Sequence, residues 1–170
     1  LDKATLMQTM RDTLKLTGMI MFVLIAAQAF ALSFRLLGGE EMISDLFGWV
    51  PGGTTGAILF MLLVLFVLGF FLEWIEISYI VLPLMLPVFA AANVDVIWLA
   101  MLVTLVLQTS FLTPPFGWAL FFLKGVAPPE VKTKHLYLGV LPFIGLQLLT
   151  LAIVFIFPSV ATGLPQSMGW

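Results

Sequence analysis

Long apolar stretches without charge alternate with short polar breaks along this chain. No Asp, Glu, Lys or Arg occurs within 46–72, within 96–123, or from 136 to the last residue. A further apolar stretch, 13–37, carries one basic residue near each end. A bilayer core takes about 20 apolar residues per helix, so each stretch suits a membrane helix or a pair of half-helices. The pattern therefore predicts an all-α integral membrane protein.

Glycines, prolines and polar clusters divide the chain into four predicted units. They are a first transmembrane helix with an outer connection (1–53), a helical hairpin (54–92), an interrupted transmembrane helix (93–127), and an amphipathic arm with a last transmembrane helix (128–170). Thr54 or Thr55 is the predicted N-cap of the hairpin, since short hydroxyl side chains satisfy free backbone donors there. The pattern leaves open whether the hairpin crosses the bilayer or is re-entrant.

Composition and charge remove several classes of function. The chain is 62% hydrophobic and only 9% charged, against roughly 25% charged residues in soluble domains. The net charge is −2 and there is no basic run, which argues against nucleic-acid binding. The absence of cysteine excludes disulfides and thiolate metal sites. No nucleotide-binding or hydrolase motif is present, so we do not expect an enzyme.

The basic residues predict the orientation in the membrane, because cytoplasmic loops are enriched in Lys and Arg. Lys3, Arg11 and Lys15 precede or begin the first apolar stretch, which places that end in the cytoplasm. Lys124, Lys132 and Lys134 cluster in a later connection, which should lie on the same side. The connection after the first helix is acidic and fits the outer side.

The sequence Gln-Thr-Ser-Phe-Leu-Thr-Pro-Pro-Phe-Gly, residues 108–117, is the first candidate site. Pro114 and Pro115 remove two backbone donors and Gly117 adds freedom, so we expect two half-helices joined by an extended segment. Freed carbonyls and the hydroxyls of Ser110 and Thr113 are hard oxygen ligands that suit sodium. The simpler alternative is a proline kink whose backbone is satisfied by Ser and Thr side chains.

Glu73 and Glu76 form the second candidate site, with Gly69 and Ser78 nearby. A carboxylate at the bilayer centre costs about 2.5–3.5 kcal/mol on insertion scales, so these residues mark either a hairpin tip with a functional role or a solvated turn. His135, which follows Lys134, is more simply explained as a surface residue.

Two segments in this order resemble the large membrane subunit of TRAP (tripartite ATP-independent periplasmic) transporters. They are LGFFLEWIEISYIVLPLMLPV (68–88) and QTSFLTPPFGWALFFLKGVAP (108–128). The sequence around Glu76-Ile77-Ser78 and Thr-Pro-Pro-Phe-Gly is similar to that of the branch named for mannitol and chloroaromatic compounds. The resemblance covers nearly the whole chain, which would be the C-terminal half of such a subunit.

The resemblance implies one inverted repeat of an elevator-type transporter, with a re-entrant hairpin and an interrupted helix. It further implies sodium as the coupling ion, no other cofactor, and uptake of an organic acid anion across the bacterial inner membrane. A small membrane subunit and a periplasmic binding protein would be the partners. The residues that the resemblance places at the sodium are Gly69 and Thr113, then Ser110, Pro114 and Gly117. Those at the hairpin tip or substrate are Glu73, Glu76, Ser78 and Pro115.

Two alternatives stay open at this stage. A membrane-embedded enzyme would need Glu73, Glu76 and His135 to converge. The other alternative is a channel or a purely structural scaffold subunit. A channel would need a polar stripe along a continuous helix, and the sequence contains no such stripe.

Overall fold

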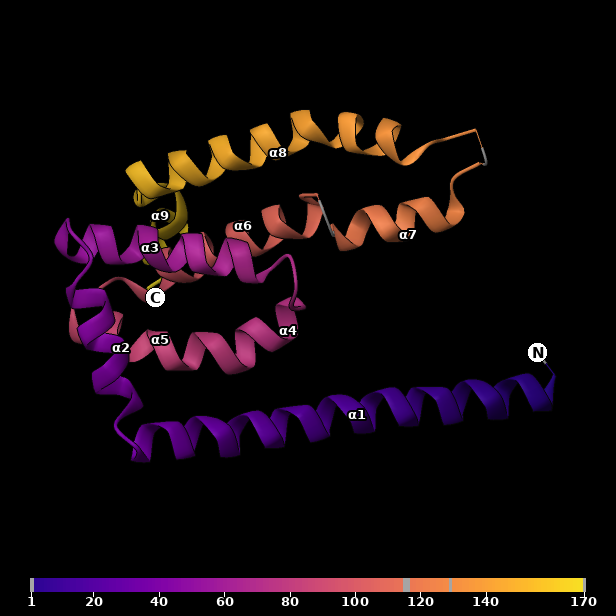
Figure 1. Ribbon diagram of the computed structural model, residues 1–170, viewed down its shortest axis with the longest axis horizontal. Coiled ribbons are helices and arrows are strands. Elements are labelled where there is room, and N and C mark those ends of the chain that lie inside the picture. The colour runs from indigo at the N-terminus through magenta and orange to yellow at the C-terminus, as the bar shows by residue number, and fades with distance from the viewer. Residues whose placement is uncertain (1, 115–116, 129, 170) are drawn as a thin grey trace.

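The computed structural model describes residues 2–114, 117–128 and 130–169, which form helices joined by short connections (Figure 1). Over these residues there is no strand, which confirms the predicted all-α class. The helices in chain order are α1 (Lys3–Leu36), α2 (Gly39–Gly48), α3 (Gly53–Leu68), α4 (Trp74–Glu76), the π-helix η1 (Ile77–Val81), α5 (Leu82–Ala91), α6 (Val96–Leu112), α7 (Trp118–Val126), α8 (Thr133–Ile156) and α9 (Ser159–Ser167).

Three helical segments of the described chain are long and apolar enough to cross a membrane. They are α1, the continuous α4–η1–α5 segment and α8, and the pair of α2 and α3, bent by 111°, would make a fourth if it is one span. Large apolar side chains such as Phe22 and Phe122 are 72% and 70% exposed. Outward apolar surface of this kind is typical of helices surrounded by lipid, and it supports a multi-pass membrane protein.

Both ends of the first membrane helix differ in detail from the sequence pattern. α1 begins at Lys3 rather than at Thr13, because the polar first residues contain no helix breaker and continue the same helix. It ends at Leu36, and Gly38 then adopts a left-handed conformation with φ +80° that turns the chain into α2.

The predicted cap of the hairpin was wrong by two or three positions. Gly52, with φ +98°, is the N-cap of α3, and Thr54 and Thr55 lie within the first turn. A left-handed residue is needed here because α2 and α3 meet at 111°, and only glycine takes that conformation without strain. Trp49 at the end of α2 is 88% exposed.

The chain turns back on itself between α3 and α4, over residues 69–73. Figure 1 shows this turn about halfway along the length of α1, level with the interruption between α6 and α7. The same view places the N-terminal end of α1 and the α7–α8 connection at one end of the molecule. In this view the hairpin turn therefore lies close to the junction of α6 and α7 along the long axis of the molecule.

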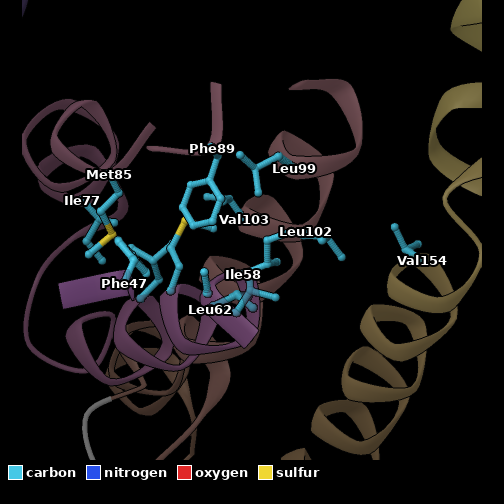
Figure 2. Close-up of a cluster of buried hydrophobic side chains, with 14 of the residues drawn as sticks. Phe47, Ile58, Leu62, Ile77, Met85, Phe89, Leu99, Leu102, Val103 and Val154 are labelled. Carbon is cyan, nitrogen blue, oxygen red and sulfur yellow. The ribbon is translucent and has the colours of Figure 1, made fainter. Parts of the chain in front are cut away.

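The core lies where α2, the hairpin and α6 meet (Figure 2). Phe47 of α2 is 4% exposed and packs edge-to-face on Phe89 and Phe60, with ring centroids 5.3 and 5.8 Å away. Aromatic pairs of this geometry add to the burial of the rings themselves. The short α2 is thereby fixed against the base of the hairpin.

Trp98 adds a hydrogen bond to the packing of α6 against α8. The indole Nε1 of Trp98 donates to the carbonyl oxygen of Val154 at 2.7 Å, and its ring lies 5.7 Å from that of Phe155. Residue 158 is a proline and has no N–H for this carbonyl, so the indole satisfies an acceptor that the helix cannot. This bond holds the end of α8 against the start of α6.

Candidate functional site

The helix of residues 96–126 is interrupted between Leu112 and Trp118. Thr113 is extended, with φ −85° and ψ +129°, and Gly117 has φ +38° and ψ +75°. A Cβ built on Gly117 would lie 3.3 Å from the carbonyl oxygen of Leu112, so the two half-helices approach closely. Glycine is the residue that tolerates both the positive φ and the close approach. Pro115, a predicted site residue, lies outside the described residues.

The two prolines leave two carbonyls at the end of α6 without their usual helical donors. Residues 114 and 115 would serve the oxygens of Ser110 and Phe111, but proline has no N–H. The backbone N–H of Thr113 donates instead to the Ser110 oxygen at 3.1 Å. Within the described residues, no backbone donor reaches the oxygen of Phe111. The sequence-based prediction did not single out Phe111, although its position four residues before Pro115 was a sufficient signal.

Three hydroxyl groups line the last turns of α6. Thr109 donates to the Leu105 oxygen at 2.7 Å, Ser110 to the Leu107 oxygen at 2.9 Å, and Thr113 to the Thr109 oxygen at 2.7 Å. A hydroxyl that donates its hydrogen to one acceptor keeps the lone pairs of its oxygen for another partner. Each of these oxygens can still accept a hydrogen bond or bind a cation.

Ser110 lies inside α6 rather than in the interruption, where the sequence pattern had placed it. Ser110 is 1% exposed and Thr109 is 0% exposed. Thr109 was not among the predicted site residues, yet it is the most deeply buried of the three hydroxyls. Its spacing of one and four residues from Ser110 and Thr113 was the available signal.

Gly69, at the C-terminal end of α3, lies against Ser110. A Cβ built on Gly69 would lie 2.7 Å from the Cβ of Ser110 and closer still to its hydroxyl oxygen, which no real side chain could do. The contact brings the first residue of the hairpin turn to the last turns of α6. Among the described residues, no backbone donor reaches the carbonyl oxygen of Gly69. The Gly69–Ser110 contact therefore brings the hairpin turn to the end of α6, a few residues before Thr113 and Pro114 in the chain.

The two glutamates lie at the start of α4 and close its first turn. The backbone N–H of Glu73 donates to a carboxylate oxygen of Glu76 at 3.0 Å. This hydrogen bond is an N-terminal cap, which satisfies one of the backbone N–H groups that have no partner at the start of a helix. Glu73 is exposed and Glu76 is partly buried. The arrangement gives Glu76 a structural role at the hairpin tip.

Ser78 lines a cavity of 590 Å³ between the second arm of the hairpin and α6. Its walls are mainly aliphatic, and the polar side chains on them include Ser78, Thr104 and Gln108. A mostly apolar cleft with a few polar groups is the usual form of a small-molecule site. Trp74, which lies between Glu73 and Glu76 in the sequence, also lines this cavity, so the cavity borders the hairpin tip.

His135 lies in the first turn of α8, where its Nδ1 accepts from the backbone N–H of Lys132 at 3.4 Å. In the described parts of the chain, no three His, Asp or Glu side chains come together in a way that could hold a metal. Glu73, Glu76 and His135 therefore do not form a metal-holding group within these residues.

Comparison with known proteins identifies the family. The family model "Tripartite ATP-independent periplasmic transporter, DctM component" matches residues 1–160. The chain is similar to the sialic acid TRAP transporter permease protein SiaT of Haemophilus influenzae, at 27% identity over 95% of this chain and 26% of that protein. It is 33% identical to the C4-dicarboxylate TRAP transporter large permease protein DctM of Vibrio cholerae, over 92% of this chain and 34% of that protein.

A third relative is the 2,3-diketo-L-gulonate TRAP transporter large permease protein YiaN of Escherichia coli, with 25% identity over 91% of this chain and 36% of that protein. The chain thus spans from 26% to 36% of the length of these three relatives. No solved structure matches the chain significantly. The family match over nearly all of the sequence shows that the chain belongs to the DctM component family of tripartite ATP-independent periplasmic transporters.

Proposed function

We propose that the chain forms part of a permease that takes up an organic acid anion by sodium-coupled secondary transport across the bacterial inner membrane. The family supports this proposal, since relatives are named for sialic acid, C4-dicarboxylate and 2,3-diketo-L-gulonate. The apolar helices and the absence of a nucleotide-binding motif in the sequence agree with an ion gradient as the energy source.

The contact between Gly69 and Ser110 is the observation that carries the sodium proposal. It joins a hairpin turn to the end of an interrupted helix, and unwound carbonyls at such junctions coordinate Na⁺ in other transporters. The proposed ligands are backbone oxygens at Gly69, Thr113 and Pro114 and the hydroxyls of Ser110 and Thr113. Gly117 permits the close approach of the second half-helix.

The oxygens at this junction fit a small hard cation. The hydroxyls of Ser110 and Thr113 donate to carbonyls within α6, so their oxygens face a new partner as acceptors only. Carbonyl and hydroxyl oxygens are the ligands that alkali and alkaline-earth ions prefer. The neighbourhood would therefore bind sodium without any carboxylate.

We further propose that the hairpin is re-entrant and moves with the interrupted helix in an elevator mechanism. The position of the hairpin turn, level with the interruption, supports this arrangement (Figure 1). On this proposal the chain is the C-terminal half and second inverted repeat of a subunit in the mannitol and chloroaromatic-compound branch. Its partners are a small membrane subunit and a periplasmic binding protein, as the tripartite family implies.

The cavity beside Ser78 is the proposed substrate side of the site. It opens between the hairpin and α6, so substrate there would contact both elements that carry the sodium ligands. Glu73, Glu76 and Pro115 are assigned to the hairpin tip and its surroundings rather than to sodium.

The test is uptake by proteoliposomes that contain the assembled transporter and are supplied with its binding protein. An inward sodium gradient should drive accumulation of the acid, and replacement of external sodium by choline should abolish it. Accumulation that persists in choline would contradict sodium coupling. Ion conductance that does not saturate with substrate would instead indicate a channel.

A further inference from the structure

The second arm of the hairpin contains a carbonyl that its own helix cannot satisfy. Pro87 lies inside α5 and has no N–H to donate to the oxygen of Pro83, four residues earlier. An unpaired carbonyl is costly wherever water is scarce, as it is for a helix in a membrane. Another donor is needed at this point of the arm.

Arg35, in the last turn of α1, supplies that donor. Its Nη2 donates to the Pro83 oxygen at 3.3 Å, across 48 positions of sequence. Its Nε lies 3.0 Å from a carboxylate oxygen of Glu40, at the start of α2. A planar guanidinium presents several donors in fixed directions, so one side chain can serve both partners at once. Arg35 thereby joins α1, α2 and α5.

A second backbone carbonyl in the chain is likewise satisfied by a side chain from another helix. The carbonyl of Val154 lacks a helical donor because of Pro158, and the indole of Trp98 on another helix satisfies it at 2.7 Å. In both cases a proline frees a carbonyl and a long side chain from a distant segment binds it. The Arg35 contact is therefore more than an ion pair at the end of α1.

We propose that Arg35 is a positioning residue that latches the second arm of the hairpin to the corner between α1 and α2. The arm around it is locally irregular, since the π-helix Ile77–Val81 contacts α1 and runs directly into the helix that contains Pro83 and Pro87. π-Helices and prolines both weaken the regular hydrogen-bond ladder. The hydrogen bond from Arg35 of α1 replaces one that the irregular arm lacks, and it fixes the position of the arm against α1.

The simpler interpretation is a surface arginine that pairs with Glu40 and favours the C-terminal end of α1. Both side chains of that pair are partly exposed, at 47% and 43%, and exposed ion pairs contribute little. This interpretation gives no role to Pro87. The latch predicts instead that the need for Arg35 depends on whether residue 87 has an N–H.

Hydrogen exchange of residues 77–91 in the assembled transporter tests the dependence. Arg35→Met removes the donor but keeps side-chain length, and it should speed exchange of this segment about fivefold. In a Pro87→Ala background, the new N–H satisfies the Pro83 oxygen, so Arg35→Met should change exchange less than twofold. Pro83→Ala is the matched control, because it also removes a proline from α5 yet leaves that oxygen without a helical donor. In that background the fivefold effect should remain.

An equal effect of Arg35→Met in all three backgrounds would overturn the latch. So would an unchanged exchange rate in the Arg35→Met variant itself. The latch is a property of the fold and does not depend on sodium-coupled uptake, so uptake measured on the same preparations separates it from the proposed function. A background-dependent exchange effect in a protein that shows no sodium-dependent uptake would contradict the proposed function and leave the latch standing.

Discussion

Gly69 and Ser110 lie in contact across the junction between the hairpin turn and α6, with no room for a side chain on Gly69. The contact joins two segments that are 41 positions apart in the chain (110 − 69). Ser110 is held in this position, because its hydroxyl donates a hydrogen bond to the Leu107 oxygen and its side chain is buried. The close approach is therefore a fixed feature of the fold, with consequences for stability.

Gly69→Ala should destabilise the protein by about 2 kcal/mol, since an added methyl group in a filled site forces its neighbours apart. The measurement is the melting temperature of the purified protein in detergent. Gly145→Ala is the matched control, because no heavy atom lies within 4 Å of a Cβ at that exposed position of α8. Adding Ser110→Gly to Gly69→Ala should recover most of the loss. Equal melting temperatures for the two alanine variants would contradict the close contact.

Thr113→Ala should raise the sodium concentration that half-saturates uptake about tenfold, the effect of losing a ligand worth roughly 1.4 kcal/mol. The hydroxyl of Thr113 keeps its lone pairs because it donates to the Thr109 oxygen. Thr113→Ser retains that oxygen and should stay within about twofold of the unaltered protein. The measurement is uptake against sodium concentration at saturating substrate. A Ser variant as impaired as the Ala variant would remove the hydroxyl from the proposed site.

Local chemistry explains why much of this fold was predictable from the sequence. The all-α class follows from long apolar stretches that no strand pattern fits, and the structure confirms it. Two successive prolines after Thr113 disfavour a continuous helix beyond Leu112, and the structure ends α6 there. The exposed apolar surface follows from composition alone, because the chain has too few charged residues to cover itself.

What could not be predicted depends on contacts between distant segments. Thr54 was a reasonable cap by propensity, but the bend between α2 and α3 requires the positive φ of Gly52. The partner of Arg35 could not be found by inspection, since the acceptor at Pro83 becomes free only because of Pro87. Nothing in the local sequence indicated that Ser110 would be helical rather than part of the unwound segment. These features are set by tertiary packing, which propensity does not encode.

Glu76→Ala should loosen the hairpin tip by about 1 kcal/mol, because the carboxylate accepts the backbone N–H of Glu73 at 3.0 Å. Glu76→Gln keeps an acceptor oxygen at the same reach and should behave nearly as the unaltered protein. Proteolysis of the tip, or hydrogen exchange of residues 73–77, measures the effect. Should the Gln variant lose uptake while its tip stays protected, the charge of Glu76 would have a role beyond capping.

Trp98→Phe should separate the hydrogen bond from the ring packing at the α6–α8 contact. Phenylalanine keeps an aromatic face for Phe155 but has no N–H for the Val154 oxygen, which Pro158 leaves without a helical donor. The expected loss is about 1 kcal/mol of stability, seen as a lower melting temperature. Pro158→Ala supplies a backbone N–H and should reduce that loss. An undiminished loss in the double variant would show that the indole acts by packing alone.

The orientation in the membrane can be tested with single cysteines, because residues 1–170 contain none. The N-terminal end of α1 and the α7–α8 connection lie at one end of the molecule, and α2 lies toward the other (Figure 1). Lys3 and Lys134 belong to the first end, and the 88%-exposed Trp49 closes α2. In intact spheroplasts a membrane-impermeant maleimide should label Trp49→Cys but not Lys3→Cys or Lys134→Cys. After permeabilisation all three should react. Labelling of only one of the two lysine positions in intact spheroplasts would contradict the prediction that these two ends lie on the same side of the membrane.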